Sequence, residues 1–503
     1  MTVLTGPRPR AFLPAVAAIA TAGGTAAALH YARLGLTLSH YDARGHLIVA
    51  RRVFDSITPG WQQFGAVWLP LPHLLNAIPV QLDLLYRTGA SGVAISVVSF
   101  AIAATAIAAI VLRLTASVVA AGVAAAVFVL NPNVLYLQAT PMTEPLLLAL
   151  LTLGVALLIR DLPPSFARVQ GVVLALACLT RYEAWPVTYL AIVLAGFAWL
   201  RQGRPVSATL RRFGTVALYP TLALILFAIV SRVVVGRWFV SGDFFVPENK
   251  ALGAPSVAVD EIAWGVRQLS GAVVTWMAAA GAVAMLATGA VRRSDSASLV
   301  PLALAATALV PLAAFVDGHP FRIRYMVPLI AFEATAVGCG VGLLRRIPRA
   351  RWDVVAAVIA AGVAAYEVRP LDSEAPMVVE AQWDRPNVAA RAQVTACLAG
   401  RDRHDKIMAS MGSLGHYMQE ASRAGFELRD FLHEGNGDIW LAALDDPRPF
   451  AGWILIEEKA EGGDMLAKLA REHPAFLTGY SRVCEAAGLA LYQRQNLILS
   501  VKR

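Results

Sequence analysis

Residues 90–112 read ASGVAISVVSFAIAATAIAAIVL, a stretch without a single charged side chain. Similar apolar runs of about 16 to 24 residues recur along the chain and are separated by short polar stretches rich in Arg. About 20 apolar residues span a bilayer core of about 30 Å as a helix. A helix also satisfies its own backbone hydrogen bonds in lipid. The sequence therefore predicts a protein that crosses a membrane many times.

The charge of the chain is unevenly distributed. Of its 503 residues, 57% are hydrophobic and 15% are charged, whereas soluble domains carry roughly 25% charged residues. Residues 370–503 hold 15 Lys+Arg and 19 Asp+Glu, while the first 369 residues hold 28 and 15. The net charge of +9 thus belongs to the membrane part. Because no soluble segment is strongly basic, nucleic acid is not expected as a partner.

Arginine placement predicts the topology, because Lys and Arg collect in cytoplasmic loops. We expect an all-α bundle of about eleven transmembrane helices in a bacterial inner membrane, with the N-terminus in the cytoplasm. Residues 1–368 form this membrane domain, whose long first outer loop, 31–88, carries helices lying in the interface. The helices are expected near residues 11–30, 90–112, 116–131, 145–159, 169–180, 184–200, 213–235, 268–290, 298–316, 325–343 and 353–367.

Residues 369–503 have a different pattern of apolar and charged residues and are predicted to form a small periplasmic α/β domain. Short apolar runs alternate with charged segments, which indicates alternating strands and helices. Cys397 and Cys484 fall in this domain, where an oxidising periplasm permits a disulfide between them if their geometry allows it. Strands are expected at 406–410, 453–456 and 489–493, and helices at 414–424 and 465–472.

Charged residues of the membrane part gather at the predicted outer ends of the helices. Ionisable groups are costly in lipid, so this bias indicates a site at the outer surface. The outer loop also carries arginines against the topology rule, and an anionic ligand is one explanation for them. These arginines are Arg33, Arg44, Arg51, Arg52 and Arg87, and the outer acids are Asp42, Asp55, Asp83, Glu144, Glu183, Asp243, Glu248, Asp260, Glu261 and Asp317.

Five short motifs lie at these outer ends and together resemble one known family. They are Tyr41-Asp42, the Pro-Leu-Pro-His run at 70–73, Thr143-Glu144-Pro145, the Leu-Thr-Arg-Tyr-Glu run at 179–183, and Arg324-Tyr325 with Pro328. An acidic residue in a long first outer loop is typical of the C-type glycosyltransferase superfamily. The resemblance is closest to bacterial enzymes similar to protein mannosyltransferases and the aminoarabinose transferase of lipid A (glycosyltransferase family 39-like). Unlike the paired Asp-Glu of protein mannosyltransferases, Asp42 is followed by Ala43, which argues against a protein hydroxyl as acceptor.

The resemblance implies a polyprenyl-phosphate sugar donor and inversion at the anomeric carbon. Asp42 is then the candidate base that accepts the acceptor's proton, although it could instead cap a helix or pair with Arg44. Glu144 would orient the acceptor or help to hold a metal. Since an acid suits the start of a helix, Glu144 could equally be a capping-type residue.

The remaining candidates would bind the donor phosphate or assist the acceptor. The arginines could neutralise the phosphate, because a planar guanidinium forks onto its oxygens; snorkelling at the interface is the alternative. The auxiliary residues are expected to form hydrogen bonds, since their spacing matches no compact metal motif. The phosphate group comprises Arg181, Arg322, Arg324 and Tyr325, and the auxiliary group comprises His46, His73, Glu183 and His319.

The function expected from these residues is transfer of a sugar to an envelope lipid, glycan or protein at the periplasmic face. No cofactor is certain, but a divalent metal ion is a candidate, with Asp42, Glu144 and His73 as possible ligands. The alternative is a transporter or flippase of a lipid-linked or envelope solute. Transporters place ionisable groups near the bilayer midplane and often have repeated halves, whereas these acids gather at one face and the chain has no evident repeat.

Overall fold

The computed structural model describes residues 11–65, 67–236, 238, 249–344, 352–399 and 404–495. The chain folds into two compact units. The helical unit comprises Met1–Leu34, Ala66–Pro72 and Val93–Glu380, and the α/β unit comprises Gly35–Gly65, His73–Gly92 and Ala381–Arg503. Two of the predicted outer acids, Asp243 and Glu248, lie outside the described residues.

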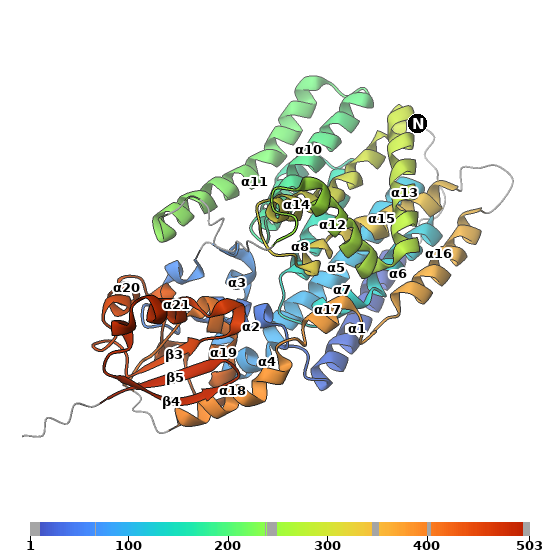
Figure 1. The fold of residues 1–503 in the computed structure, drawn as a ribbon. Coiled ribbons are helices and arrows are strands. Elements are labelled where there is room, and N and C mark those ends of the chain that lie inside the picture. The colour runs from blue at the N-terminus through green and yellow to red at the C-terminus, as the bar shows by residue number, and fades with distance from the viewer. Residues whose placement is uncertain are drawn as a thin grey trace, which may run out of the picture. The chain divides into compact units, whose positions relative to one another are not determined.

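Within the described residues of the helical unit, seven helices are long and apolar enough to cross a membrane (Figure 1). They are α1 (Phe12–Arg33), α5 (Ala90–Thr115), α10 (Ala184–Arg201), α11 (Val206–Val235), α13 (Ala272–Val291), the 3₁₀ helix η3 (Arg293–Ala308) with α14 (Leu309–Val316), and η4 (Ile323–Met326) with α15 (Leu329–Leu343).

Four shorter apolar helices accompany them. These are α6 (Val118–Val129), α8 (Glu144–Leu158), α9 (Phe166–Cys178) and α16 (Trp352–Val368). The predicted multi-pass helical architecture is confirmed. The figure of about eleven crossings stays a prediction, because length and composition assign only the seven longer helices.

One helix of this unit was missed, since no helix was expected between the predicted helices at 213–235 and 268–290. Helix α12 (Pro255–Ser270) begins with a proline, which suits the first turn of a helix. It buries Ala258, Ile262, Gly265 and Leu269, which recur every three or four residues. This period is the signal of an amphipathic helix that the sequence did contain.

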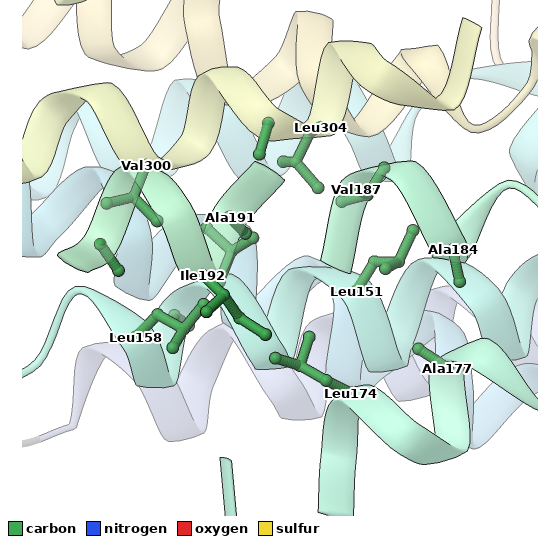
Figure 2. Packing of buried hydrophobic residues seen from close by; sticks show 14 of the residues in the cluster. Leu151, Leu158, Leu174, Ala177, Ala184, Val187, Ala191, Ile192, Val300 and Leu304 are labelled. Atoms are coloured by element: carbon green, nitrogen blue, oxygen red, sulfur yellow. The ribbon is translucent and has the colours of Figure 1, made fainter. Parts of the chain in front are cut away.

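The core of the helical unit is tightly packed where α8, α9, α10 and η3 meet. Figure 2 shows Leu151, Leu174, Ile192 and Val300 from these four helices directed toward one another. Elsewhere small residues let backbones approach, as is common between membrane helices. A methyl group on Gly281 of α13 would lie 2.0 Å from the carbonyl oxygen of Ala336 in α15. Glycine is therefore required at this helix crossing.

The α/β unit is built on a five-stranded sheet with the order β2-β1-β3-β5-β4. Strand β1 is parallel to β2 and β3, while β5 is antiparallel to β3 and β4. The predicted strands are confirmed as β1, β3 and β5, whereas β2 and β4 were not predicted. The strands are β1 (Ile407–Ala409), β2 (Phe431–Leu432), β3 (Trp453–Glu457), β4 (Tyr480–Ala486) and β5 (Leu489–Arg494).

Helices cover both faces of this sheet, because successive strand residues point to opposite sides. Ile407 and Leu455 face one core, and Met408 and Ile454 face the other. The first core is formed by α2 (Tyr41–Arg51), α18 (Arg385–Cys397) and α19 (Met411–Ala421), and the second by α20 (Asp438–Asp445) and α21 (Met465–Glu472) (Figure 1). The predicted helices at 414–424 and 465–472 correspond to α19 and α21.

Helix α2 is the unexpected member of this layer, because it comes from the first outer loop. Its Leu47 and Ile48 are 0% and 1% exposed and belong to the core that contains Tyr417 of α19. The α/β unit thus depends on a segment more than 300 residues earlier in the chain. A disulfide joins Cys397 of α18 to Cys484 of β4, with their Cα atoms 6.5 Å apart.

Candidate functional site

The residues singled out in the sequence fall on both units. The α/β unit carries three of them, all in segments of the first outer loop, and the helical unit carries the rest. The first group is Asp42, His46 and His73; the second is Glu144, Arg181, Glu183, His319, Arg322, Arg324 and Tyr325.

Asp42 lies in the first turn of α2 and is 4% exposed. The helix is capped by His40, whose Nδ1 accepts the Asp42 backbone N–H at 3.1 Å. The residue that caps α2 is therefore His40. An acidic residue in the first turn of a helix suits the helix dipole.

One turn further along α2, His46 contacts His73. His46 Nδ1 and His73 Nε2 are 3.0 Å apart, and the two side chains are 6% and 1% exposed. A hydrogen bond between two imidazoles needs one nitrogen to donate and the other to accept. The pair thus joins His73 to α2, the helix that also carries Asp42.

Four of the five arginines of the outer loop belong to the α/β unit and lie beside carboxylates of that unit, whereas Arg33 ends α1 in the helical unit. Arg44 forms an ion pair with Glu420 of α19, and Arg51 Nε lies 2.9 Å from the carboxylate of Asp55. Burial raises the pKa of Asp55, but the hydrogen bonds from Arg51, Arg429 and Leu428 outweigh it and lower the pKa. Intramolecular carboxylates thus account for charges that the sequence left open to an anionic ligand. The further partners are Asp384 for Arg44, Asp83 for Arg51 and Arg87, and Glu434 beside Arg52.

In the helical unit, Arg181 binds two carboxylates at once. It lies between α9 and α10, and its Nη1 donates to Glu144 Oε1 at 2.9 Å and to Thr143 Oγ1 at 3.0 Å. Its Nη2 donates to Glu183 Oε1 at 2.6 Å, and its Nε contacts both Glu183 oxygens. Helices α8, α9 and α10 are therefore joined at one end by a single guanidinium. Thr143 was quoted in a motif but was not singled out as a candidate.

This cluster is deeply buried yet not fully bonded. The side chains of Glu144, Glu183 and Arg181 are 0%, 5% and 14% exposed. Burial alone lowers the pKa of the Arg181 guanidinium, but Glu144 and Glu183 outweigh it and raise the pKa above its usual value. Among the described residues, Glu144 Oε2 has no hydrogen-bond donor. The hydrogen bonds described above use about four of the five N–H groups of Arg181.

Arg324 brings a second positive charge toward this cluster. It belongs to η4 and is 7% exposed. Its positive charge repels that of Arg181 and acts to lower the pKa of the Arg181 guanidinium. Its guanidinium lies 5.5 Å from the ring centroid of Tyr325, whose hydroxyl is 3.4 Å from His319 Nε2. Arg322, half-buried, directly precedes η4. The predicted phosphate-binding residues Arg181 and Arg324 are thus electrostatic neighbours.

Burial lowers the pKa of His319, and the positive charges of Arg322 and Arg324 act in the same direction, against a hydrogen bond with the Pro320 carbonyl. The imidazole is therefore held neutral near neutral pH. A neutral ring can accept the hydrogen bond of the Tyr325 hydroxyl.

Residues 67–72 form a strap against the same end of the helical unit. The backbone N–H of Leu71 donates to the Leu179 carbonyl at 3.0 Å, and the Tyr182 hydroxyl donates to the Val67 carbonyl at 3.1 Å. Leu69 packs with Phe227 of α11. The Pro-Leu-Pro run quoted in the sequence is thereby fixed beside the turn that carries Arg181, an arrangement that sequence reasoning did not anticipate.

The part of the chain that the structure describes contains no preformed metal site. No three His, Cys, Asp or Glu side chains there are grouped so that they could hold a metal ion. A divalent metal ion accordingly stays a prediction, with no coordination geometry to support it.

Comparison with known proteins relates the chain to others through its fold. No family model matches the sequence, and no curated protein matches it. The structure of ArnT from Cupriavidus metallidurans bound to undecaprenyl phosphate matches with a TM-score of 0.56 and 12% identity, over 93% of this chain and 97% of that one. Apo ArnT matches with a TM-score of 0.57 and 11% identity, over 94% and 98%.

A third match, at a TM-score of 0.48 and 10% identity, is an oligosaccharyltransferase from Archaeoglobus fulgidus, over 95% of this chain and 73% of that one. The two ArnT matches extend along nearly the whole of both chains. They show that this chain has the fold of ArnT, a helical unit followed by a small α/β unit as the sequence predicted. This chain therefore shares its fold with ArnT over nearly its whole length.

Proposed function

We propose that this chain is an inverting glycosyltransferase of the periplasmic membrane face, which moves a sugar from a polyprenyl-phosphate donor to an envelope lipid, glycan or protein. The observation that carries the proposal is the fold shared with an ArnT structure bound to undecaprenyl phosphate, which matches 97% of that chain and both units of this one. A fold hosts many functions, so the proposal also needs a site with suitable chemistry.

The proposed reaction is a single displacement. An acceptor hydroxyl attacks the anomeric carbon while the bond from that carbon to the phosphate oxygen breaks. Asp42 takes the hydroxyl proton, and polyprenyl phosphate leaves with the electron pair. The sugar is inverted because attack comes from the side opposite the leaving group.

The helical unit supplies charges that suit the leaving phosphate. Arg324 and Arg322 are the residues we assign to it, because guanidinium groups fork onto phosphate oxygens. Arg181 contributes mainly by holding Glu144 and Glu183. Glu144 Oε2 is then the atom we assign to orienting the acceptor. Tyr325 packs its ring against Arg324 and contacts His319 through its hydroxyl, and the His46–His73 pair supports α2.

The experiment is a transfer assay with the purified chain in lipid nanodiscs and a panel of polyprenyl-phosphate sugars. Release of polyprenyl phosphate is measured for wild type, Asp42→Asn and Asp446→Asn, an exposed acid of the same unit paired with Arg448. We expect Asp42→Asn to lower kcat by at least about 100-fold, as for loss of a general base, and Asp446→Asn to have no effect.

Retention of full activity in Asp42→Asn would remove Asp42 as the base. Movement of an intact lipid-linked sugar or solute across liposomes, without release of polyprenyl phosphate from any donor, would instead favour the transporter or flippase. The panel of donors also identifies the sugar, and the product identifies the acceptor.

A further inference from the structure

The helical unit has a cavity at the end remote from Glu144. It has a volume of about 250 Å³ and lies among the last turns of α5, α8 and α10, with α13 and η3. Helix α8 begins at Glu144 and contributes Leu158 to this cavity. Fifteen helical residues rise about 22 Å. The cavity is therefore separate from the cluster around Arg181.

Three arginines line its mouth: Arg113, Arg160 and Arg204. Arg204 is held in place, because its Nη2 lies 2.8 Å from Asp161 and its guanidinium lies 5.2 Å from the Trp199 ring centroid. Arg113 and Arg160 make no side-chain hydrogen bond or ion pair with any described residue. Two guanidinium groups thus lie at the same mouth with their donors available to a ligand.

Acidic groups also contribute to the lining and set the charge balance. Asp161 is neutralised by Arg204, and Asp295 is the other carboxylate. Three guanidinium groups against two carboxylates leave the mouth with an excess of one positive charge. The floor is different in character, since it is formed by Leu158, Met285 and other apolar or small residues. These are Ile159, Ala195, Val300, Cys339 and Leu343.

Such a lining suits a ligand with a small anionic head and an apolar body. Pockets for small molecules hold roughly 300–1,000 Å³, so this cavity has room for a head group and the first carbons of a chain. Basic pockets between membrane helices bind phosphorylated lipid head groups. Topology signalling explains why arginines lie in such turns, but it does not require them to surround a cavity with an apolar floor.

We propose that this cavity is a second lipid site, which binds the phosphate of a membrane lipid through Arg113, Arg160 and Arg204 and seats the start of its chain on the apolar floor. The proposal is independent of the transfer reaction. It would hold for a transferase and for a transporter alike, so the two proposals fail separately.

The test compares two lipids that differ only in the phosphate, dioleoylphosphatidic acid and dioleoylglycerol, added to the full-length protein in detergent. Binding is measured by native mass spectrometry. We expect phosphatidic acid to bind at least about tenfold more tightly than dioleoylglycerol, since charge-assisted bonds to phosphate are the strong ones. Arg113→Gln/Arg160→Gln should remove most of this preference.

The matched control is Arg211→Gln/Arg293→Gln, which removes two exposed arginines that do not line the cavity. This variant should bind phosphatidic acid like wild type. Because Arg113 and Arg160 make no bonds with described side chains, their replacement should leave the thermal midpoint unchanged. Equal loss in both double variants would reduce the effect to general surface charge and overturn the proposal. Displacement of the lipid by millimolar inorganic phosphate would assign the site to free phosphate and overturn its lipid part.

Discussion

Two buried guanidinium–carboxylate clusters, one in each unit, contain the same kinds of groups but differ in how completely they are bonded. In the α/β unit, Arg391 binds both oxygens of Asp384, at 2.6 Å each, and both oxygens of Glu420, at 2.8 and 2.6 Å. In the helical unit, Arg181 also binds two carboxylates, but Glu144 Oε2 has no donor among the described residues.

The difference separates a cluster that stabilises a fold from one that can accept a ligand. Arg44 completes the first cluster by pairing with Glu420, so α2 is tied to α18 and α19. A buried carboxylate oxygen without a donor costs free energy that a bonded one does not, and all four oxygens of Asp384 and Glu420 are bonded. We therefore interpret the Arg391 cluster as structural and the Arg181 cluster as part of the proposed site. Each prediction below tests one side of this distinction.

The largest effect is expected from breaking the closed cluster. Arg391→Ala leaves Asp384 and Glu420 with Arg44 as their remaining guanidinium partner in the α/β unit, and loss of one partner of a buried pair costs about 3–5 kcal/mol. Because Asp384 is 26% exposed, we expect the lower part of this range, about 3 kcal/mol. Hydrogen-exchange mass spectrometry should detect the loss of protection in α19 and β1.

Arg448→Ala is the control for this variant, because its partner Asp446 is exposed and such pairs contribute little. Its exchange should match wild type. Unchanged protection of α19 in Arg391→Ala would mean that the cluster does not stabilise the unit.

The disulfide tests the same unit through a covalent bond. Cys397 and Cys484 are 87 residues apart, and bridges that close long loops typically stabilise by about 2–4 kcal/mol. Cys397→Ser/Cys484→Ser should therefore destabilise the α/β unit by about 2 kcal/mol, measured by limited proteolysis in urea. The buried Cys178 and Cys339 of the helical unit are free thiols, so dithiothreitol should leave that unit unaffected. Equal sensitivity of both units to dithiothreitol would contradict this assignment.

The open cluster should respond in activity more than in stability. Glu144→Gln keeps the size of the side chain but removes a charge that we assign to the acceptor, and we expect kcat/KM to fall by about 100-fold, or roughly 2.7 kcal/mol. The matched variant Glu183→Gln removes the other carboxylate on Arg181, whose oxygens are both bonded. It should lower activity less and the thermal midpoint more. If Glu183→Gln lowered activity more than Glu144→Gln, the role of orienting the acceptor would pass to Glu183.

The sequence predicted the parts of this molecule whose signals are local. Apolar runs located the long helices, and the runs at 406–410, 453–456 and 489–493 located three strands. Strand β2 has only two residues, and β4 buries only one of its seven residues, so neither offered a hydrophobic period to recognise. The sequence predicted helix α2 as an interfacial helix of the first outer loop, but its place in the core of the α/β unit depends on contacts that no local pattern encodes.

The site followed the same rule. The sequence identified three charged residues at helix ends as candidates, because an ionisable side chain in a membrane segment is costly and usually functional. They are Glu144, Arg181 and Glu183. Their mutual bonds were not predictable, since the three helices had first to be packed. Likewise, the outer-loop arginines suggested an anionic ligand until their carboxylate partners from the α/β unit were located.

The last effect concerns the pH dependence of stability and again tests the Arg391 cluster. Burial is the main reason that the pKa of His416 is lowered from 6.5 to about 4; Arg391 and Arg44 act in the same direction, while Asp384 and Glu420 oppose them. His416 therefore binds a proton near pH 6.5 in the unfolded chain, but only near pH 4 in the folded unit. Stability from this residue is complete above pH 6.5 and is lost as the pH falls toward 4.

We expect the free energy of unfolding of the α/β unit to fall by about 2 kcal/mol more between pH 7 and pH 4 in wild type than in His416→Gln. Urea titration followed by proteolysis at each pH measures it. Burial and Arg52 also lower the pKa of His433, to about 3, so both proteins should still lose some stability. His473→Gln, at an exposed position, should follow wild type. Identical pH profiles for wild type and His416→Gln would mean that His416 does not report on the cluster.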